Sequence, residues 1–253
     1  MTCKNFIIKN TVLTKYIGNE KTIVIPGDVE KIGKEAFYES SVEKVIIEDG
    51  VKVIGESAFC GCGKLTEIVL PNTLEVIEYD AFCSCNLEKI VLPDSLKKIG
   101  KAPFTICKRL TEIVVGENNK IVKSIDGNLF SINGKKLIWY PMSCTNKEYV
   151  VPVGTEIIGE AAFAWNDHIK RIILPNGVKK ICGDAFGRCK RLQEVVIPAS
   201  VVEIENDLDG LGTFSHIHPL LSMLGITPPT IKAPADSYAE QYAKEQNIPF
   251  VAI

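Results

Sequence analysis

The amino-acid sequence predicts an α/β repeat solenoid, in which short parallel strands stack from one turn of the chain to the next. The main observation is a phrase that recurs through most of the 253 residues, a hydrophobic residue and proline followed by Val/Leu-x-x-Ile-Gly-x-x-Ala-Phe-x-x-Cys. Its phenylalanines Phe37, Phe59, Phe82 and Phe104 follow one another at intervals of 22, 23 and 22 residues. A fixed period of this length indicates units that bury their apolar faces only against their neighbours.

Composition and charge fit an ordered chain without a strongly charged partner. The sequence is 46% hydrophobic and carries a formal net charge of −2. No global charge therefore drives it toward nucleic acid or a membrane surface. Its apolar runs, such as residues 45–47, are far too short to cross a bilayer. We therefore expect no nucleic-acid partner and no membrane insertion.

The repeat phrase divides the chain into segments of a single domain, residues 1–253. In order, we assign an N-terminal segment (1–21), repeats (22–115), a hairpin insert (116–146), further repeats (147–205), and a divergent loop with a C-terminal cap (206–253). A hairpin is predicted in the insert because Asn133-Gly134 separates two apolar stretches. The insert also echoes the N-terminal segment, since residues 126–129 align with residues 10–13. Both segments therefore read as a short hairpin that leads into a fresh run of repeats.

The phrase fails after Ile204, and the remaining segments are read individually. Residues 210–219 are expected to form a loop and residues 220–224 a helical turn. A terminal helix is predicted after residue 235, because Asp236 can cap it and Asn247 and Pro249 can end it. Its apolar stripe would consist of Tyr238, Ala239, Tyr242 and Ala243. Such a helix would cover the last turn, which would otherwise expose strand edges and core.

Together these residues resemble the leucine-rich repeats of the BspA type. The resemblance rests on the repeat phrase, on Asp-Gly-Asn-Leu in the insert and on the Ser-Tyr-Ala-Glu-Gln-Tyr-Ala tail, and it spans the chain except residues 205–230. It implies a right-handed leucine-rich-repeat superhelix. Proteins of this type are known mainly as bacterial and protist surface proteins implicated in adhesion. The resemblance therefore implies a non-enzymatic scaffold that binds a protein partner of unknown identity, with cell-surface adhesion as one role.

Nine cysteines require an explanation, and most follow the repeat. Four lie three residues after the phenylalanine, where Ser40 and Asn166 stand in other repeats, and these four are Cys62, Cys85, Cys107 and Cys189. We interpret them as a buried ladder of small side chains that hydrogen-bond the next turn. The alternative is a metal- or redox-responsive protein, in which the Cys60/Cys62 and Cys83/Cys85 pairs form disulfides or hold zinc. The odd number and the C-x-C spacing favour the ladder.

Charged residues form two predicted columns along the stacked repeats. The first column lies just before the first strand isoleucine and consists of Lys44, Glu67, Lys89 and Glu112, then Arg171 and Glu194 after the insert. The second lies just after the Val/Leu of the Val/Leu-x-x-Ile motif and consists of Glu30, Lys52, Glu75 and Lys97, then Glu156 and Lys179. Opposite charges on neighbouring strands stabilise the stack modestly. Residues 166–192 carry seven cations and two acids, while residues 193–209 carry five acids and no cation. We expect these two stretches to neutralise each other.

Aromatic residues that the repeat does not require are the candidate protein contacts. Trp165 occupies a place filled elsewhere by Glu39, Gly61 and Ser84, and Trp139-Tyr140 lies in the insert. Large exposed aromatics are favoured at protein interfaces. The alternative is that they pack within the fold, which is the favoured interpretation for Trp139.

No catalytic constellation is evident, so we expect no enzyme activity and no cofactor. His216 and His218 could form a metal pair if extended, but no further ligand stands beside them. No phosphate-binding glycine loop or nucleophile elbow occurs. The first ten residues lack the apolar stretch of a secretion signal. We expect a monomer that is cytoplasmic as the sequence stands, or secreted or on the cell surface if a signal precedes it.

Overall fold

The computed structural model describes residues 5–206, 213–214 and 228–253. The chain divides into two compact units, Met1–Ile132 (unit 1) and Asn133–Ile253 (unit 2), and each is described by itself. The division falls in the turn where Gly134 adopts a left-handed φ of 73°, at the Asn133-Gly134 pair that marks a turn in the sequence.

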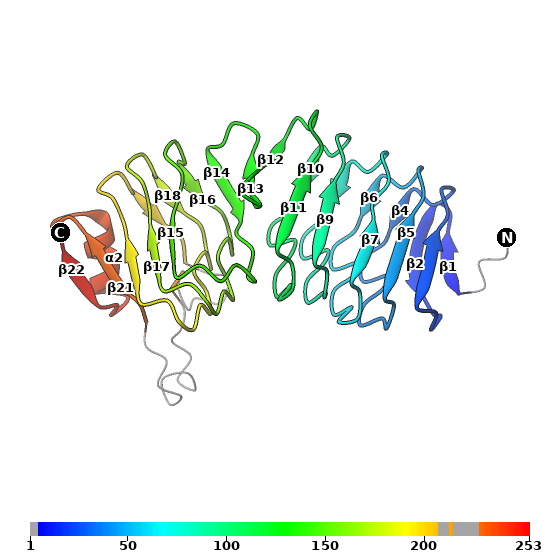
Figure 1. The fold of residues 1–253 in the computed structure, drawn as a ribbon, viewed down its shortest axis with the longest axis horizontal. Helices are drawn as coiled ribbons and strands as arrows, with labels where there is room; N and C mark the ends of the chain where they lie inside the picture. Colours follow the sequence, from blue (N-terminus) through cyan, green and yellow to red (C-terminus); the bar gives the residue numbers. More distant parts are fainter. Residues whose placement is uncertain (1–4, 207–212, 215–227) are drawn as a thin grey trace. The chain divides into compact units, whose positions relative to one another are not determined.

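Unit 1 stacks short strands into two layers (Figure 1). One sheet begins with the antiparallel hairpin β1–β2 and continues in parallel: β1 (Phe6–Lys9), β2 (Val12–Tyr16), β4 (Lys31–Ile32), β6 (Val53–Ile54), β8 (Val76–Ile77) and β10 (Lys98–Ile99). The other layer holds β3 (Thr22–Ile25), β5 (Lys44–Ile47) and β7 (Glu67–Val69), and then the parallel pair β9 (Lys89–Leu92) and β11 (Glu112–Val115). The unit ends with the antiparallel hairpin β12 (Val122–Ile125) and β13 (Asn128–Ser131).

Unit 2 repeats this plan and adds a cap. Its first parallel row is β14 (Lys136–Trp139), β16 (Ile157–Ile158), β18 (Lys180–Ile181) and β20 (Glu203–Ile204). Its second is β15 (Glu148–Val150), β17 (Arg171–Ile173), β19 (Glu194–Val196), β21 (Thr230–Ala233) and β22 (Phe250–Ala252). Helix α2 (Tyr238–Glu245) connects β21 to β22. The predicted solenoid of parallel strands is confirmed, as is the expected echo between hairpins β1–β2 and β12–β13.

Left-handed residues shape the turn that contains Ala-Phe in each repeat. In the first repeat Glu35 and Glu39 both have a φ of 55°. This conformation costs a non-glycine residue about 1–2 kcal/mol. It directs alternate N–H groups at the next turn, so that Glu35, Phe37 and Glu39 donate to Glu56, Ala58 and Cys60 at 3.0, 2.8 and 2.9 Å. Inter-turn hydrogen bonds therefore offset the backbone strain.

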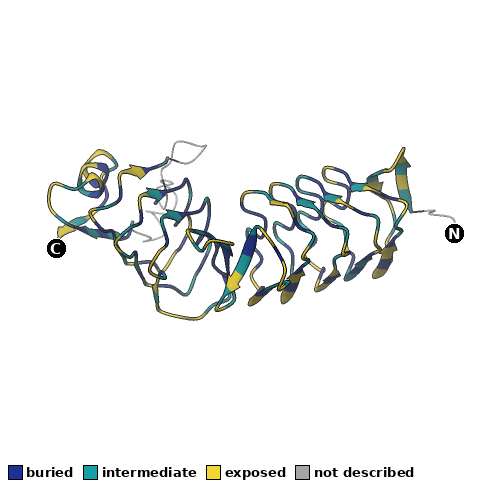
Figure 2. Cartoon of the chain, turned by 90° about the horizontal axis from the view of Figure 1, so that it is seen from above, coloured by how far each residue is buried: buried dark blue, intermediate teal, exposed yellow. Residues whose placement is uncertain are grey.

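The core of each unit is a column of stacked aromatic rings. In unit 1 the Phe37–Phe59, Phe59–Phe82 and Phe82–Phe104 ring centroids lie 4.8, 5.6 and 5.8 Å apart. In unit 2 Phe163 and Phe186 lie 5.6 Å apart. Buried residues line the inside of the turns and exposed ones the outside (Figure 2). Because each ring packs on the next, the stack itself provides the core.

The ladder continues past the point where the phrase was expected to fail. Phe214 lies 5.0 Å from Phe186, ring centroid to ring centroid, and is 1% exposed. The Phe186 N–H donates to the Thr213 carbonyl at 3.3 Å, as Phe163 donates to Ala185. Thr213-Phe214 therefore fills the Ala-Phe place of a further turn, and the predicted loop contains a buried turn of the stack that was not predicted. The rest of 210–219 and the predicted helical turn at 220–224 lie outside the described residues.

The terminal helix is confirmed, with a different N-cap. Asp236 has a φ of 59°, whereas Ser237 is extended and its Oγ accepts from the Glu240 N–H at 3.3 Å. Ser237 is therefore the cap, because an N-cap residue needs β-region geometry. Of the expected stripe, Ala239, Tyr242 and Ala243 are buried, while Tyr238 is 40% exposed. Strand β22, after the helix, was not predicted.

Candidate binding surfaces

An aliphatic column, exposed at three of its five positions and half-buried at Ile46 and Val114, runs along the outer face of β3, β5, β7, β9 and β11. We call it the unit 1 stripe; it consists of Val24, Ile46, Val69, Val91 and Val114. The register aligns Val24 with Ile46 and Val69, and Val91 with Val114. Val24, Val69 and Val91 are 46%, 45% and 52% exposed. Because successive residues of a strand face opposite sides, these side chains point away from the core.

Unit 2 carries a shorter version of the same feature. Val150, Ile173 and Val196 align across β15, β17 and β19, and the next partner in the column is Lys232. We call these three residues the unit 2 stripe. Sequence reasoning missed both stripes. The available signal was a strand that is apolar at consecutive positions, such as Val45-Ile46-Ile47, in a layer that is covered on one side only.

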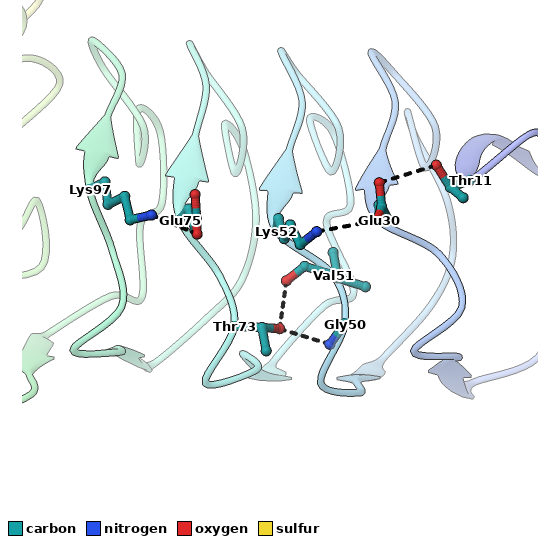
Figure 3. Close-up of polar contacts among 8 residues, drawn as sticks. All are labelled: Thr11, Glu30, Gly50, Val51, Lys52, Thr73, Glu75 and Lys97. Atoms are coloured by element: carbon teal, nitrogen blue, oxygen red, sulfur yellow. Dashed lines mark hydrogen bonds and ion pairs between the residues drawn. The ribbon is translucent and has the colours of Figure 1, made fainter.

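The two predicted charge columns are confirmed as ladders. In the first, Lys44–Glu67, Lys89–Glu112 and Arg171–Glu194 form ion pairs of 2.6, 3.0 and 2.6 Å. In the second, the pairs are Lys52–Glu30 at 3.2 Å, Lys97–Glu75 at 2.7 Å and Lys179–Glu156 at 3.6 Å. Figure 3 shows the unit 1 part of this second ladder, which begins where the Thr11 hydroxyl donates to Glu30. In the same view the Thr73 hydroxyl accepts from the Gly50 N–H and donates to the Val51 carbonyl. These charges serve the stack and offer no single-sign surface.

The buried cysteine ladder is also confirmed, except that each thiol hydrogen-bonds the preceding turn and not the next one. The thiols of Cys62, Cys85 and Cys107 point at the carbonyls of Phe37, Phe59 and Phe82, at 3.0, 3.1 and 3.0 Å. Cys189 reaches the Phe163 carbonyl at 3.0 Å, and the Asn166 amide does the same for Pro141 at 3.1 Å. Burial raises the pKa of Cys107 and of Cys189 to about 12. These thiols are therefore protonated donors and poor nucleophiles at neutral pH.

The metal and redox alternative gains no support from the described part of the chain. None of its eight cysteines forms a disulfide, and no three His, Cys, Asp or Glu residues within it cluster as metal ligands. Burial raises the pKa of Cys60 to about 12, and the neighbouring Cys83 adds to the rise. Cys3, His216 and His218 lie outside the described residues.

Trp165 lies half-buried on the outside of unit 2. Its φ is 63°, the left-handed value also found at Glu39, Ser84 and Arg188 in the same place of other turns. The Arg188 guanidinium carbon lies 4.6 Å from the centroid of the indole. The conformation comes from the inter-turn hydrogen bond that the Trp165 N–H donates to the Gly187 carbonyl at 2.8 Å. Nothing in the backbone therefore requires an indole here.

Trp139 and Tyr140 are buried, so neither is an exposed contact of the insert, and for Trp139 this agrees with the favoured interpretation that it packs within the fold. They are 2% and 1% exposed. The Tyr140 ring lies 5.1 Å from that of Phe163 and 4.6 Å from that of Tyr149. Tyr140 therefore fills the phenylalanine place of the first turn of unit 2. Its burial follows from the aromatic column, a constraint that the irregular insert sequence conceals.

A group of cations lies in the turns that precede β15, β17 and β19. We call Lys147, Lys170, Arg188 and Arg191 the basic turns; all four are exposed. Adjacent turns are linked by hydrogen bonds from Lys170 N to Lys147 O at 2.7 Å and from Gln193 N to Lys170 O at 2.8 Å. Lys190, next to Arg191, has a long contact of 3.8 Å with Asp167. Of the carboxylates that the structure describes, none lies within ion-pair distance of the four basic-turn cations.

The expected neutralisation of residues 166–192 by residues 193–209 is only partly correct. Glu194 binds Arg171 and Lys232, at 2.6 and 2.7 Å. Glu203 and Glu205 both bind Lys180, and these hydrogen bonds raise the pKa of the lysine. The cations that form these ion pairs lie in strands, where the pairing of strands holds neighbouring residues in register. The three described acids of this stretch, Glu194, Glu203 and Glu205, all pair with strand cations and so leave the cations of the basic turns without them. Asp207 and Asp209 lie outside the described residues.

Among the helices described, none is long and apolar enough to traverse a lipid bilayer. No curated protein matched the sequence.

A pneumococcal vaccine antigen, PcpA, shares the fold with a TM-score of 0.58 and 19% identity, covering 92% of this chain and 79% of that one. A leucine-rich repeat protein from Eubacterium ventriosum aligns with a TM-score of 0.68 and 19% identity, covering 89% of this chain and 66% of that one.

The match of the sequence to a protein family is more specific than these structural similarities. The family described as "BspA type Leucine rich repeat region" matches residues 30–146 and 142–208 in 6 copies. These ranges contain the turns whose phenylalanine column, cysteine ladder and left-handed residues are described above. The chain belongs to the BspA-type leucine-rich repeat family.

Proposed function

We propose that the chain is a non-enzymatic scaffold that binds a partner protein through the outer faces of its sheets. The observation that carries this proposal is the unit 1 stripe. Val24, Val69 and Val91 of this stripe are about half exposed, and covering them with a partner is favourable by roughly 25 cal/mol per Å² of apolar surface. Solvent-exposed columns of this kind are typical of interaction sites.

The ladder beside the stripe supports a protein partner. Lys44–Glu67 and Lys89–Glu112 border the stripe two residues before its aliphatic positions. An apolar centre with a paired, polar rim is the usual arrangement of a protein interface. Adhesion at a cell surface is one use of such a scaffold that we propose on the basis of family membership, with Trp165 as a further contact residue.

Binding can be tested by placing a charge in the stripe. A Val69→Glu, Val91→Glu double variant should lose most of the protein that the immobilised wild-type chain retains from an extract of its source cells, because the charges would have to be desolvated. Val153→Glu is the control, since Val153 is 91% exposed and lies outside both stripes. Thermal melting should confirm that all variants fold. Equal retention by the double variant and the control would refute a role for the stripe.

A further inference from the structure

We propose that the basic turns of unit 2, together with Trp165, bind an acidic segment of a partner protein that also carries aliphatic residues. This inference rests on the proposed protein-binding function and assigns a partner chemistry to a second, separate surface. Its starting point is an excess of positive charge that the fold does not neutralise within the described residues. Lys147, Lys170, Arg188 and Arg191 are exposed on three consecutive turns.

Unit 1 shows how the same turn is neutralised by an acid of the preceding turn. The tetrapeptide Cys-Lys-Arg-Leu occurs twice, at residues 107–110 and 189–192. In unit 1 Arg109 forms an ion pair with Glu88 of the preceding turn. In unit 2 the equivalent place is taken by Lys170. The equivalence follows from hydrogen bonds, because Thr111 N donates to Glu88 O and Gln193 N donates to Lys170 O. Arg191 therefore faces a cation where Arg109 faces an acid.

Like charges held in adjacent turns repel each other, and an anion that binds between them removes this repulsion. Two of the four cations are arginines, whose planar guanidinium groups bind carboxylates through paired hydrogen bonds. Arg188 is also held over the Trp165 indole at 4.6 Å. This contact orders a side chain that would otherwise be mobile, which lowers the entropic cost of using it as a contact.

The position of the unit 2 stripe favours a polypeptide over a nucleic acid. Lys147 is followed three residues later by Val150, which is 57% exposed and aligned with Ile173 and Val196. An anionic ligand that extends from the basic turns along the strands therefore meets aliphatic side chains. A peptide with both carboxylates and apolar residues matches this surface. A nucleic acid would instead need a longer basic track and several stacking aromatics.

The test uses the full chain and three fluorescent probes: a twelve-residue peptide of alternating Glu and Val, the same peptide with Gln for Glu, and a twelve-nucleotide single-stranded DNA. Fluorescence anisotropy should show the acidic peptide binding at least about tenfold more tightly than the Gln peptide and the DNA. Its affinity should fall as salt rises from about 50 to 300 mM. Equal affinity for the Glu and Gln peptides, or tighter binding of the DNA, would overturn the proposal.

Matched variants locate the site. Arg191→Ala and Lys170→Glu should each weaken binding of the acidic peptide about tenfold or more, because each removes favourable charge. Lys170→Glu should leave the melting temperature unchanged or higher, since it gives Arg191 the ion pair that Arg109 has. Arg109→Ala is the control and should leave peptide affinity unchanged. An equal loss with Arg109→Ala and Arg191→Ala would contradict the assignment to unit 2.

Gain of binding provides an independent check. Glu88→Lys should create a second set of basic turns in unit 1 and increase the amount of acidic peptide bound per chain. This result does not depend on the stripe experiment, which uses cell extract and variants of unit 1 valines. Loss of extract binding with unchanged peptide binding, or the reverse, therefore shows which of the two proposals fails.

Discussion

The two Cys-Lys-Arg-Leu tetrapeptides have the same sequence and the same place in the repeat, yet they have different electrostatic surroundings. In both, the cysteine thiol reaches a phenylalanine carbonyl of the preceding turn, at 3.0 Å. The arginines differ, because Arg109 pairs with Glu88, whereas Lys170 occupies the place that corresponds to Glu88 in the turn before Arg191. The repeated sequence motif therefore determines the buried core, whereas the charges on the outer surface differ from one turn to another. Three further experiments test this division between a shared core and a variable surface.

The largest effect should be shared by the two units. Phe82→Ala and Phe163→Ala each remove a fully buried ring from an aromatic column. Each should lower the free energy of unfolding by about 3–5 kcal/mol, the usual cost of a cavity of this size. Urea unfolding followed by circular dichroism measures the loss. A cost below about 1 kcal/mol in either unit would show that the columns are not equivalent cores.

An intermediate effect should separate the units at the ladder position. In unit 1 the Cys85 thiol donates to the Phe59 carbonyl, so Cys85→Ala should cost about 0.5–1.5 kcal/mol beyond the lost packing and Cys85→Ser less. In unit 2 Asn166 donates to Pro141 O and accepts from the N–H groups of His168 and Ile169. Asn166→Leu leaves all three groups without that partner, at about 1–3 kcal/mol for each buried group.

The same denaturation experiments compare these variants. If Asn166→Leu is no more destabilising than Cys85→Ala, then the extra hydrogen bonds of the asparagine do not contribute to stability. In that case the ladder place merely requires a small side chain in both units.

The smallest effect concerns the surface ladders. Arg171 pairs with both Glu148 and Glu194, at 2.8 and 2.6 Å, whereas Lys89 in the same column pairs with Glu112 at 3.0 Å. Arg171→Gln should therefore cost more than Lys89→Gln, with both in the range of about 0.2–1 kcal/mol expected for exposed pairs.

The pH dependence of stability shows whether the cost of these ladder variants is electrostatic. Hydrogen bonds from Lys232 and then Arg171 lower the pKa of Glu194 in the folded chain. A lowered folded-state pKa means that this stabilisation is present above about pH 4.5 and is lost as the pH falls through the folded-state value. The cost of Arg171→Gln should therefore shrink between pH 7 and pH 3. A cost that stays constant over this range would show that it arises from packing.

Much of the interior could be predicted from the sequence because its rules are local and repeat. The positions of Phe82 and Cys85 follow from counting, and the charge ladders follow from aligning one turn with the next. The Thr213-Phe214 turn was not predicted because Thr replaces Ala and because Phe214 comes ten positions after Ile204, whereas Phe186 comes only five positions after Ile181. The rings still stack at 5.0 Å, and only three-dimensional proximity reveals the missing turn.

The candidate surfaces were harder to predict for physical reasons. The apolar residues of Val45-Ile46-Ile47 read as a buried strand, since hydropathy does not say whether a second layer covers the sheet. Trp139 and Trp165 look alike in sequence, but one is 2% exposed and the other lies half-buried under Arg188. Net charge over a stretch also misleads, because Glu203 and Glu205 bind Lys180 and cannot neutralise a cation in a distant turn.

The alternating ladder has a consequence for how such a chain can lengthen. The backbone repeats with every turn, so the insertion of one copy of a turn would preserve the aromatic column and the inter-turn hydrogen bonds. The charges of Lys44, Glu67, Lys89 and Glu112 repeat only with every second turn. A duplicated single turn would place lysine beside lysine or glutamate beside glutamate, which is unfavourable on adjacent strands. A gene that grows by duplicating two turns at once keeps both periods, so the electrostatic unit of this protein is a pair of repeats.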